Sequence, residues 1–274
     1  MHQRKIPSTG ELLSAIGMGT WQTFDINSEE NKENLKQLLM QMHNSGASLI
    51  DTSPMYGNAE KITGEVTQST GKAEEFFYAI KVWTSGRKEG IIQMENSIKK
   101  MQCKIPDLIQ IHNLLDWKTH LETLQQWKSE GKVRYIGITH YTDSMHDELA
   151  EVIRKNKVDF VQFNYSIFSR NAEKRLLPVA REFGVATIIN RPFAEGALSK
   201  LIQSPLPVWA AEFGIKSWAT LILKFILSHP DVTCVIPATS NHNHLYYNLL
   251  AGTGRLPDLQ ERENWIKEIE GNFN

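Results

Sequence analysis

The 274-residue chain has only two cysteines, no excess of one charge and no long apolar run. Cys103 and Cys234 are too few for a disulfide-stapled secreted domain, so we interpret them as buried thiols of a protein in a reducing compartment. The net charge of -1 argues against general binding to nucleic acid or to an anionic membrane, because both require a basic excess. No apolar run approaches the roughly 20 residues that span a bilayer.

The first residues of the chain lack the apolar segment of a secretory signal peptide. We therefore expect a cytoplasmic protein, although an exported precursor whose signal has been removed also fits the sequence. The chain also lacks low-complexity tracts and a linker between two regions of different composition. A single domain over residues 1–274 is expected, with enough length to bury a large core.

Apolar runs with strand character alternate with stretches of helical periodicity along the chain. Leu35, Leu38, Leu39 and Met42, for example, recur at the spacing of one helix face. The expected strands are residues 15–21, 47–51, 76–81, 108–112, 133–139, 160–164, 185–190 and 232–237. The expected helices between and after them are residues 29–43, 59–69, 90–101, 118–130, 144–155, 172–183, 217–228 and 242–250.

Eight strand–helix units in strict alternation predict a parallel sheet. Eight units in a chain of this length fit a (β/α)8 TIM barrel better than an open doubly wound sheet. The turn signal Ser8-Thr9-Gly10 predicts a short N-terminal β-hairpin before the barrel, and residues 259–269 predict an extra C-terminal helix. The expected fold class is therefore α/β, a barrel with these two additions.

Three of the expected strands end on a residue that can carry or move a proton. These residues are Asp51, Lys81 and His112, and Tyr56 follows the first of them in a loop stiffened by Pro54. In a barrel such ends meet at the C-terminal face, where active sites lie. Alone, Asp51 and Lys81 would fit a structural ion pair and His112 a core histidine, but the four together favour a shared site.

Together, these four residue types suit the protonation of an oxygen that becomes anionic. A phenol has a pKa of about 10, and a neighbouring lysine ammonium is expected to lower that pKa for Tyr56. A carboxylate such as Asp51 keeps the lysine charged, and a neutral His112 can donate a hydrogen bond to a carbonyl oxygen. None of these groups supplies hydride, so reduction of a carbonyl requires a cofactor.

The same residues lie within motifs that resemble those of the aldo-keto reductases, in family order over nearly the whole chain. The matching stretches are residues 17–21, 51–57, 111–113, 131–138, 162–165, 191–196 and 235–239, with Lys81 at a strand end. The resemblance is to a bacterial-type member with short loops. It implies NAD(P)H bound across the mouth of a barrel, and a catalytic tetrad of Asp51, Tyr56, Lys81 and His112 in which Tyr56 is the general acid.

The resemblance also implies positions for the cofactor. They are Thr20, Trp21 and Asp51 at the ribose; Thr139, His140, Gln162 and Asn190 at the nicotinamide; Arg191, Pro192, Phe193, Gly196 and Leu198 at the pyrophosphate; and Ala238, Thr239, Ser240, His244 and Asn248 at the adenosine. NADP(H) is favoured on family grounds. Many relatives carry Lys and Arg for the 2′-phosphate where this chain has Ala238 and His244, so NAD(H) is compatible as well. Many also stack an aromatic ring where Asn190 stands.

A small carbonyl compound is the expected substrate, and the resemblance implies pocket walls at Trp21, Met55, Trp83, Asn113 and Phe193. No nucleic-acid or membrane partner is expected. No metal site is expected either, because His242 and His244 lack an evident third ligand. A monomer is expected. Two alternatives remain open: an NAD(P)+-dependent sugar or alcohol dehydrogenase, and a nucleotide-binding regulatory subunit with little turnover.

Overall fold

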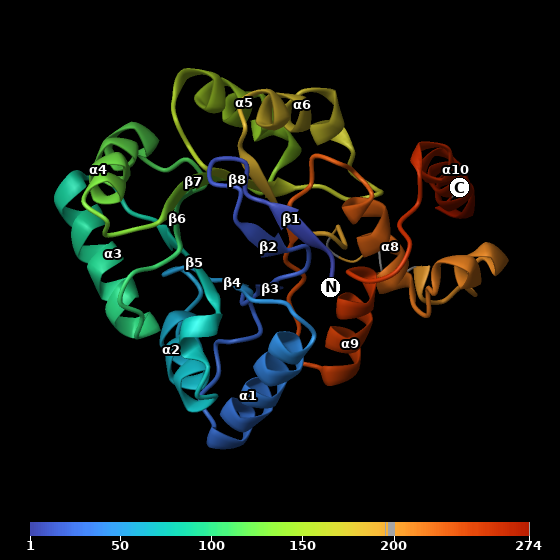
Figure 1. The fold of residues 1–274 in the computed structure, drawn as a ribbon, viewed down its shortest axis with the longest axis horizontal. Coiled ribbons are helices and arrows are strands. Elements are labelled where there is room, and N and C mark those ends of the chain that lie inside the picture. The colour runs from blue at the N-terminus through green and yellow to red at the C-terminus, as the bar shows by residue number, and fades with distance from the viewer. Residues whose placement is uncertain (195, 197–200, 274) are drawn as a thin grey trace.

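A computed structural model describes residues 1–194, 196 and 201–273, and its centre is a parallel sheet of eight strands in the order β3 to β10. The strands stand in a ring with helices around it (Figure 1). The ring comprises β3 (Met18–Gly19), β4 (Leu49–Asp51), β5 (Phe77–Val82), β6 (Leu108–His112), β7 (Tyr135–Thr139), β8 (Phe160–Asn164), β9 (Ala186–Asn190) and β10 (Cys234–Val235). The predicted (β/α)8 barrel is therefore confirmed.

Backbone contacts between the first and the last strand close the ring. Ile16 and Gly19 form parallel bridges to Val235 and Ala238. The N–H of Gly17 donates to the carbonyl of Val235 at 2.9 Å. A Cβ at Gly17 would lie 2.9 Å from the carbonyl oxygen of Leu49, so the seam requires a residue without a side chain here. Within the predicted strand 15–21 only β3 is a regular strand, and Ile16 outside it makes a single isolated bridge.

The helices pack their apolar faces on the outside of the ring. They are α1 (Glu29–Asn44), α2 (Ala59–Ser69), α3 (Arg87–Met101), α4 (Trp117–Ser129), α5 (His146–Lys155), α6 (Leu176–Glu182), α8 (Trp218–Leu227), α9 (His242–Ala251) and α10 (Leu259–Phe273). Short 3-10 turns lie at Ala73–Glu75, Asp143–Met145, Asn171–Lys174 and Val208–Phe213. In α1 the Ser28 hydroxyl caps the N-terminus, and the four apolar residues at helical spacing are buried as predicted.

One predicted helix is interrupted. Residues 172–183 form a 3-10 turn and then α6, with the break at Arg175 (φ -145°). Pro178 explains where the second helix starts. Proline has no N–H to donate and fits the first turn of a helix, so α6 begins just before it. No helix in the described part of the chain is both long and apolar enough to cross a bilayer.

The predicted N-terminal hairpin covers one end of the barrel. Its strands β1 (Gln3–Lys5) and β2 (Leu12–Ser14) pair antiparallel, and the hairpin crosses the middle of the ring in Figure 1. Ile6 and Leu13 join a buried cluster with residues of the barrel interior, including Phe77, Tyr135 and Phe160. This cluster seals the N-terminal end of the barrel and leaves the other end as the mouth.

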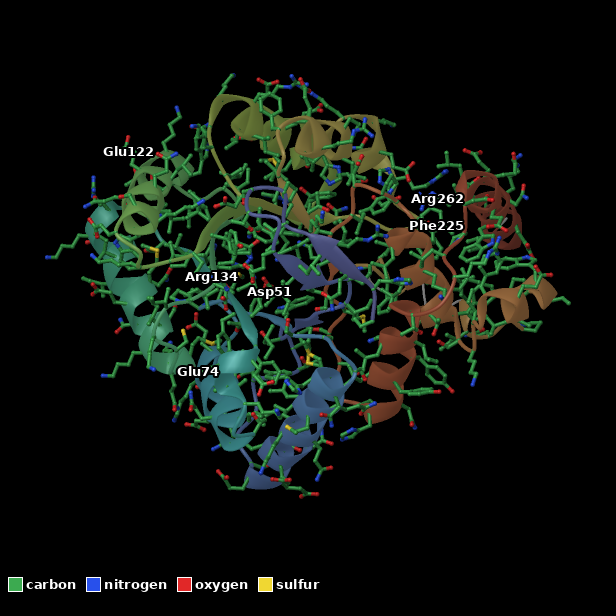
Figure 2. The ribbon with its side chains drawn as sticks, in the orientation of Figure 1. Asp51, Glu74, Glu122, Arg134, Phe225 and Arg262 are labelled. Atoms are coloured by element: carbon green, nitrogen blue, oxygen red, sulfur yellow. The ribbon has the colours of Figure 1, made fainter. Side chains whose placement is uncertain are left out.

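A buried arginine helps to anchor the predicted C-terminal helix, α10, to the barrel. Arg262 is buried with its guanidinium 4.1 Å from the ring centroid of Phe225 in α8 (Figure 2). It donates to the Tyr165 hydroxyl and to Glu173 Oε1, both at 2.8 Å. A cation on an aromatic face with satisfied hydrogen bonds tolerates burial well.

Replacing Leu13 by Ala in the hairpin should lower the free energy of unfolding by about 3 kcal/mol, because it leaves a cavity in the sealing cluster. Leu12→Ala is the matched control, since Leu12 is 59% exposed and Leu13 only 2%. That control should change stability by less than about 0.5 kcal/mol. Urea unfolding of both variants measures the difference. Equal losses would show that the hairpin does not seal the barrel.

Candidate active site

The centre of the site is a buried ion pair between neighbouring strands. Lys81 Nζ in β5 donates to Asp51 Oδ2 at the end of β4 at 2.5 Å, and to the carbonyl of Thr52 at 2.9 Å. Lys81 is fully buried and Asp51 nearly so. Figure 2 places Asp51 near the middle of the ring of strands. Burial lowers the pKa of Lys81, and the Asp51 carboxylate opposes that effect.

Two buried glutamines donate hydrogen bonds to the other carboxylate oxygen of Asp51. Gln110 Nε2 and Gln162 Nε2 donate to Asp51 Oδ1 at 3.0 and 2.8 Å. The backbone carbonyl of Asp51 accepts from both the N–H and the hydroxyl of Thr20. Gln110 was not identified from the sequence. The available signal was a lone amide within the apolar run of β6, a position where a buried polar group needs a partner.

Tyr56 lies in the loop after β4, beside this ion pair. Its ring centroid is 5.5 Å from Lys81 Nζ, and the ring meets that of His112 edge-on with 5.8 Å between centroids. Burial, followed by the charge of Asp51, raises the pKa of Tyr56 above its usual range. The expected net lowering is therefore wrong, because burial and the charge of Asp51 outweigh the Lys81 ammonium, which donates its hydrogen bonds to Asp51 and the Thr52 carbonyl. The phenol keeps its proton.

His112, the last residue of β6, is also neutral. Burial, the charge of Lys81 and nearby His140 lower its pKa to about 2. Its Nδ1 lies 2.9 Å from the hydroxyl oxygen of Ser53, which the sequence analysis did not single out as a functional residue. No pattern in the sequence predicts this contact, since Ser53 lies in the loop after β4 and His112 at the end of β6. The structure thus brings all four predicted tetrad residues together.

Polar side chains at the ends of the next strands line the mouth. Thr139 donates to Gln162 Oε1 at 3.2 Å, and Asn190 Nδ2 lies 3.5 Å from the same oxygen. Asn190 Oδ1 is buried and has no hydrogen-bond partner among the described residues. Such an acceptor fits a ligand with an N–H donor, such as the carboxamide of a nicotinamide. His140 follows β7, and its Nδ1 accepts from the N–H of Tyr141 at 3.0 Å.

The loop after β9 begins in a constrained conformation. Arg191 and Ala194 have left-handed φ values of +49° and +47°, which side-chain-bearing residues rarely adopt. The guanidinium of Arg191 lies 4.8 Å from the ring centroid of Tyr141 and donates to its carbonyl. The other expected residues of this loop are Pro192, Phe193 and Gly196, which the structure describes, and Leu198, which lies outside the described residues.

The residues expected at the adenosine lie between β10 and α9. The Gly19–Ala238 bridge places this segment beside the first strand, and Asn241 caps α9 by accepting from the N–H of Asn243 and His244. Ala238, Ser240 and His244 are exposed, whereas Thr239 and Asn248 are buried. The exposed side chains can contact a ligand directly, whereas the two buried ones are covered by other parts of the protein.

Large apolar side chains stand exposed on the loops after β3, β4 and β5. They are Trp21, Met55 and Trp83, with exposures of 46%, 40% and 39%. The Gln93 amide holds the backbone of Trp83 through two hydrogen bonds. Asn113 follows His112 with φ +55° and has a buried, unpartnered Oδ1 within the described part of the chain. Phe193 packs against the main core.

The fold and the site together define a barrel oxidoreductase. The model of the Aldo/keto reductase family matches residues 15–263, so the chain belongs to that family. This membership confirms the resemblance inferred from the motifs.

Known relatives are similar at low identity. The aldo-keto reductase YhdN of Bacillus subtilis (strain 168) is 26% identical over 216 residues, covering 73% of this chain but only 64% of YhdN. Methylglyoxal reductase YeaE of Escherichia coli (strain K12) is 27% identical over 257 residues, covering 90% and 89%. A solved aldo/keto reductase from Klebsiella pneumoniae, in complex with NADP and acetate, has a TM-score of 0.82 at 23% identity, covering 98% and 95%. The last likeness shows the fold.

The neutral state of His112 predicts a pH-dependent stability. The unfolded histidine titrates near pH 6.5 and the folded one only near 2, so below pH 6.5 the unfolded state binds an extra proton and stability falls. Between pH 7.5 and 5.5 this group alone should lower the free energy of unfolding by about 1.4 kcal/mol. Urea unfolding at both pH values should show that the free energy of unfolding falls by about 1.4 kcal/mol less in His112→Gln than in the wild type. An identical pH dependence of the two proteins would contradict a neutral buried His112.

Proposed function

We propose that the chain is a single-domain carbonyl reductase that converts an aldehyde or ketone to an alcohol with NAD(P)H, with Tyr56 as the proton donor. The observation that carries the proposal is the buried Asp51–Lys81 pair beside two protonated but uncharged groups, Tyr56 and His112. Such a site holds protons ready for an oxygen without placing a free charge in the mouth.

Each of the four side chains has its own role in protonating the carbonyl oxygen. His112 and Tyr56 each donate a hydrogen bond to that oxygen and so orient the carbonyl. NAD(P)H, when bound, supplies the hydride. As negative charge develops on the oxygen, the phenolic proton of Tyr56 moves to it. An alkoxide is a much stronger base than a phenolate, so the transfer is favourable even with the raised pKa of Tyr56. The Lys81 ammonium then stabilises the phenolate, and Asp51 holds Lys81 in place.

The polar strand ends suit a nicotinamide cofactor. Thr139, His140, Gln162 and Asn190 offer donors and acceptors for the carboxamide, and the segment from Arg191 offers a cation near the pyrophosphate. NADP(H) is favoured by the family resemblance and by the NADP-bound Klebsiella relative. Ala238 offers no charge for a 2′-phosphate, so NAD(H) can serve as the cofactor as well.

A small carbonyl compound suits the apolar rim of Trp21, Met55 and Trp83. The similarity to a methylglyoxal reductase supports a substrate of this size. Asn113 and Phe193 complete the proposed pocket. We further propose a cytoplasmic monomer that does not bind nucleic acid. The net charge of -1 leaves no basic excess for such binding.

Tyr56→Phe tests the proposal, because it removes the proton donor and keeps the ring. Turnover of 4-nitrobenzaldehyde, followed by the absorbance of the reduced nicotinamide, should fall about 100- to 10,000-fold. Binding of NADPH, followed by protein fluorescence, should be retained. Tyr78→Phe is the matched control, since the Tyr78 hydroxyl donates to the carbonyl of Ala73 and takes no part in the tetrad. Its turnover should stay near that of the wild type.

Near-normal turnover of Tyr56→Phe would exclude Tyr56 as the proton donor. Tight NADPH binding by the wild type without turnover, in either direction and over a panel of aldehydes and sugars, would instead indicate the regulatory alternative. The ratio of rates with NADPH and NADH determines the cofactor preference.

A further inference from the structure

Ser53 is a buried hydroxyl that touches a tetrad residue. It lies in the loop after β4 and has no exposed surface. Its Oγ is 2.9 Å from His112 Nδ1 and 3.3 Å from the backbone N–H of Met55. These are the polar contacts of this oxygen among the described residues.

The hydrogen-bond inventory of Ser53 determines the direction of its contact with His112. A hydroxyl has one proton to donate and two lone pairs to accept with. The N–H of Met55 can only donate, so it takes one lone pair of Ser53 Oγ. His112 Nδ1 is then the acceptor available, within the described part of the chain, for the Ser53 proton. If Nδ1 carried a proton instead, the Ser53 proton would be buried without a partner, which is unfavourable.

A neutral imidazole carries one proton, and a ring that accepts at Nδ1 carries it on Nε2. The ring of His112 is kept neutral by its burial and by its neighbours. Lys81 and His140 both disfavour a second proton on it, and Tyr56 meets it edge-on without a charge. Nε2–H is thus the single N–H donor of this side chain.

We propose that Ser53 is a positioning residue that fixes His112 as the Nε2–H tautomer through its hydrogen bond to Nδ1. The consequence for catalysis rests on the proposed function. An Nε2–H group donates to the substrate oxygen, whereas the opposite tautomer would present a lone pair to that oxygen and repel it. Ser53 therefore acts on the reaction through His112 and without touching the substrate.

Nitrogen NMR of protein with 15N-labelled histidine tests the tautomer directly and needs neither cofactor nor substrate. His112 is assigned by loss of its signals in His112→Gln. In the wild type, His112 should show a protonated Nε2 and an unprotonated Nδ1 at neutral pH. In Ser53→Ala, both nitrogens should shift toward the average of two tautomers. A wild-type Nδ1–H form, or an unchanged pattern in Ser53→Ala, would overturn the proposal.

Turnover provides the second readout. Ser53→Ala should lower kcat about three- to tenfold with little change in KM, which is the effect of one neutral hydrogen bond. Ser53→Thr keeps the hydroxyl and should recover most of kcat. Ser97→Ala, the same change at a buried serine of α3, should alter neither kcat nor the His112 signals. Thermal melting of each variant confirms folding.

The outcomes separate the positioning role from the proposed function. Full turnover of Ser53→Ala would overturn the role of Ser53 while leaving Tyr56 as the proton donor. A wild type inactive toward every carbonyl compound would contradict the proposed function, and the NMR result would still decide the tautomer.

Discussion

The contact between Asp51 and Lys81 is the interaction on which the site depends. Two opposite charges buried at 2.5 Å are favourable only when their remaining hydrogen-bonding groups are satisfied. Gln110 in β6, Gln162 in β8 and the carbonyl of Thr52, next to Asp51 in the chain, provide that satisfaction. The two glutamines reach Asp51 only when β6 and β8 are in register with β4, so the fully hydrogen-bonded pair depends on the barrel fold.

The pair also explains why the rest of the site is uncharged. Burial and then the charge of Lys81 lower the pKa of His112 and keep it neutral, and burial and then the charge of Asp51 raise the pKa of Tyr56 and keep its proton on. Two neutral donors thus face the mouth, while the one lysine charge lies behind them. A carbonyl oxygen becomes negative during reduction. His112 and Tyr56 would first donate hydrogen bonds to it, Tyr56 would then transfer its proton, and the Lys81 ammonium lies nearby throughout. The site is therefore arranged to stabilise a negative charge that appears only during the reaction.

The sequence predicted what depends on local pattern. Alternating periodicities gave the barrel, and proton-handling residues at strand ends gave Asp51, Lys81, His112 and the loop residue Tyr56. It did not predict Ser53 or Gln110, because their contacts depend on strands that meet only in the closed ring. The direction of the Tyr56 pKa shift was also wrong from sequence, since it depends on burial and on where the lysine points. The cofactor and pocket residues remain predictions.

A double-mutant cycle on turnover tests most directly whether Asp51 and Lys81 act as one unit. The four proteins are the wild type, Asp51→Asn, Lys81→Met and the double variant, each shown to be folded. If Asp51 works by holding Lys81, then Asp51→Asn should slow the wild type strongly and have little further effect once Lys81 is Met. Losses that simply multiply in the double variant would show that the two residues contribute independently and would contradict the account.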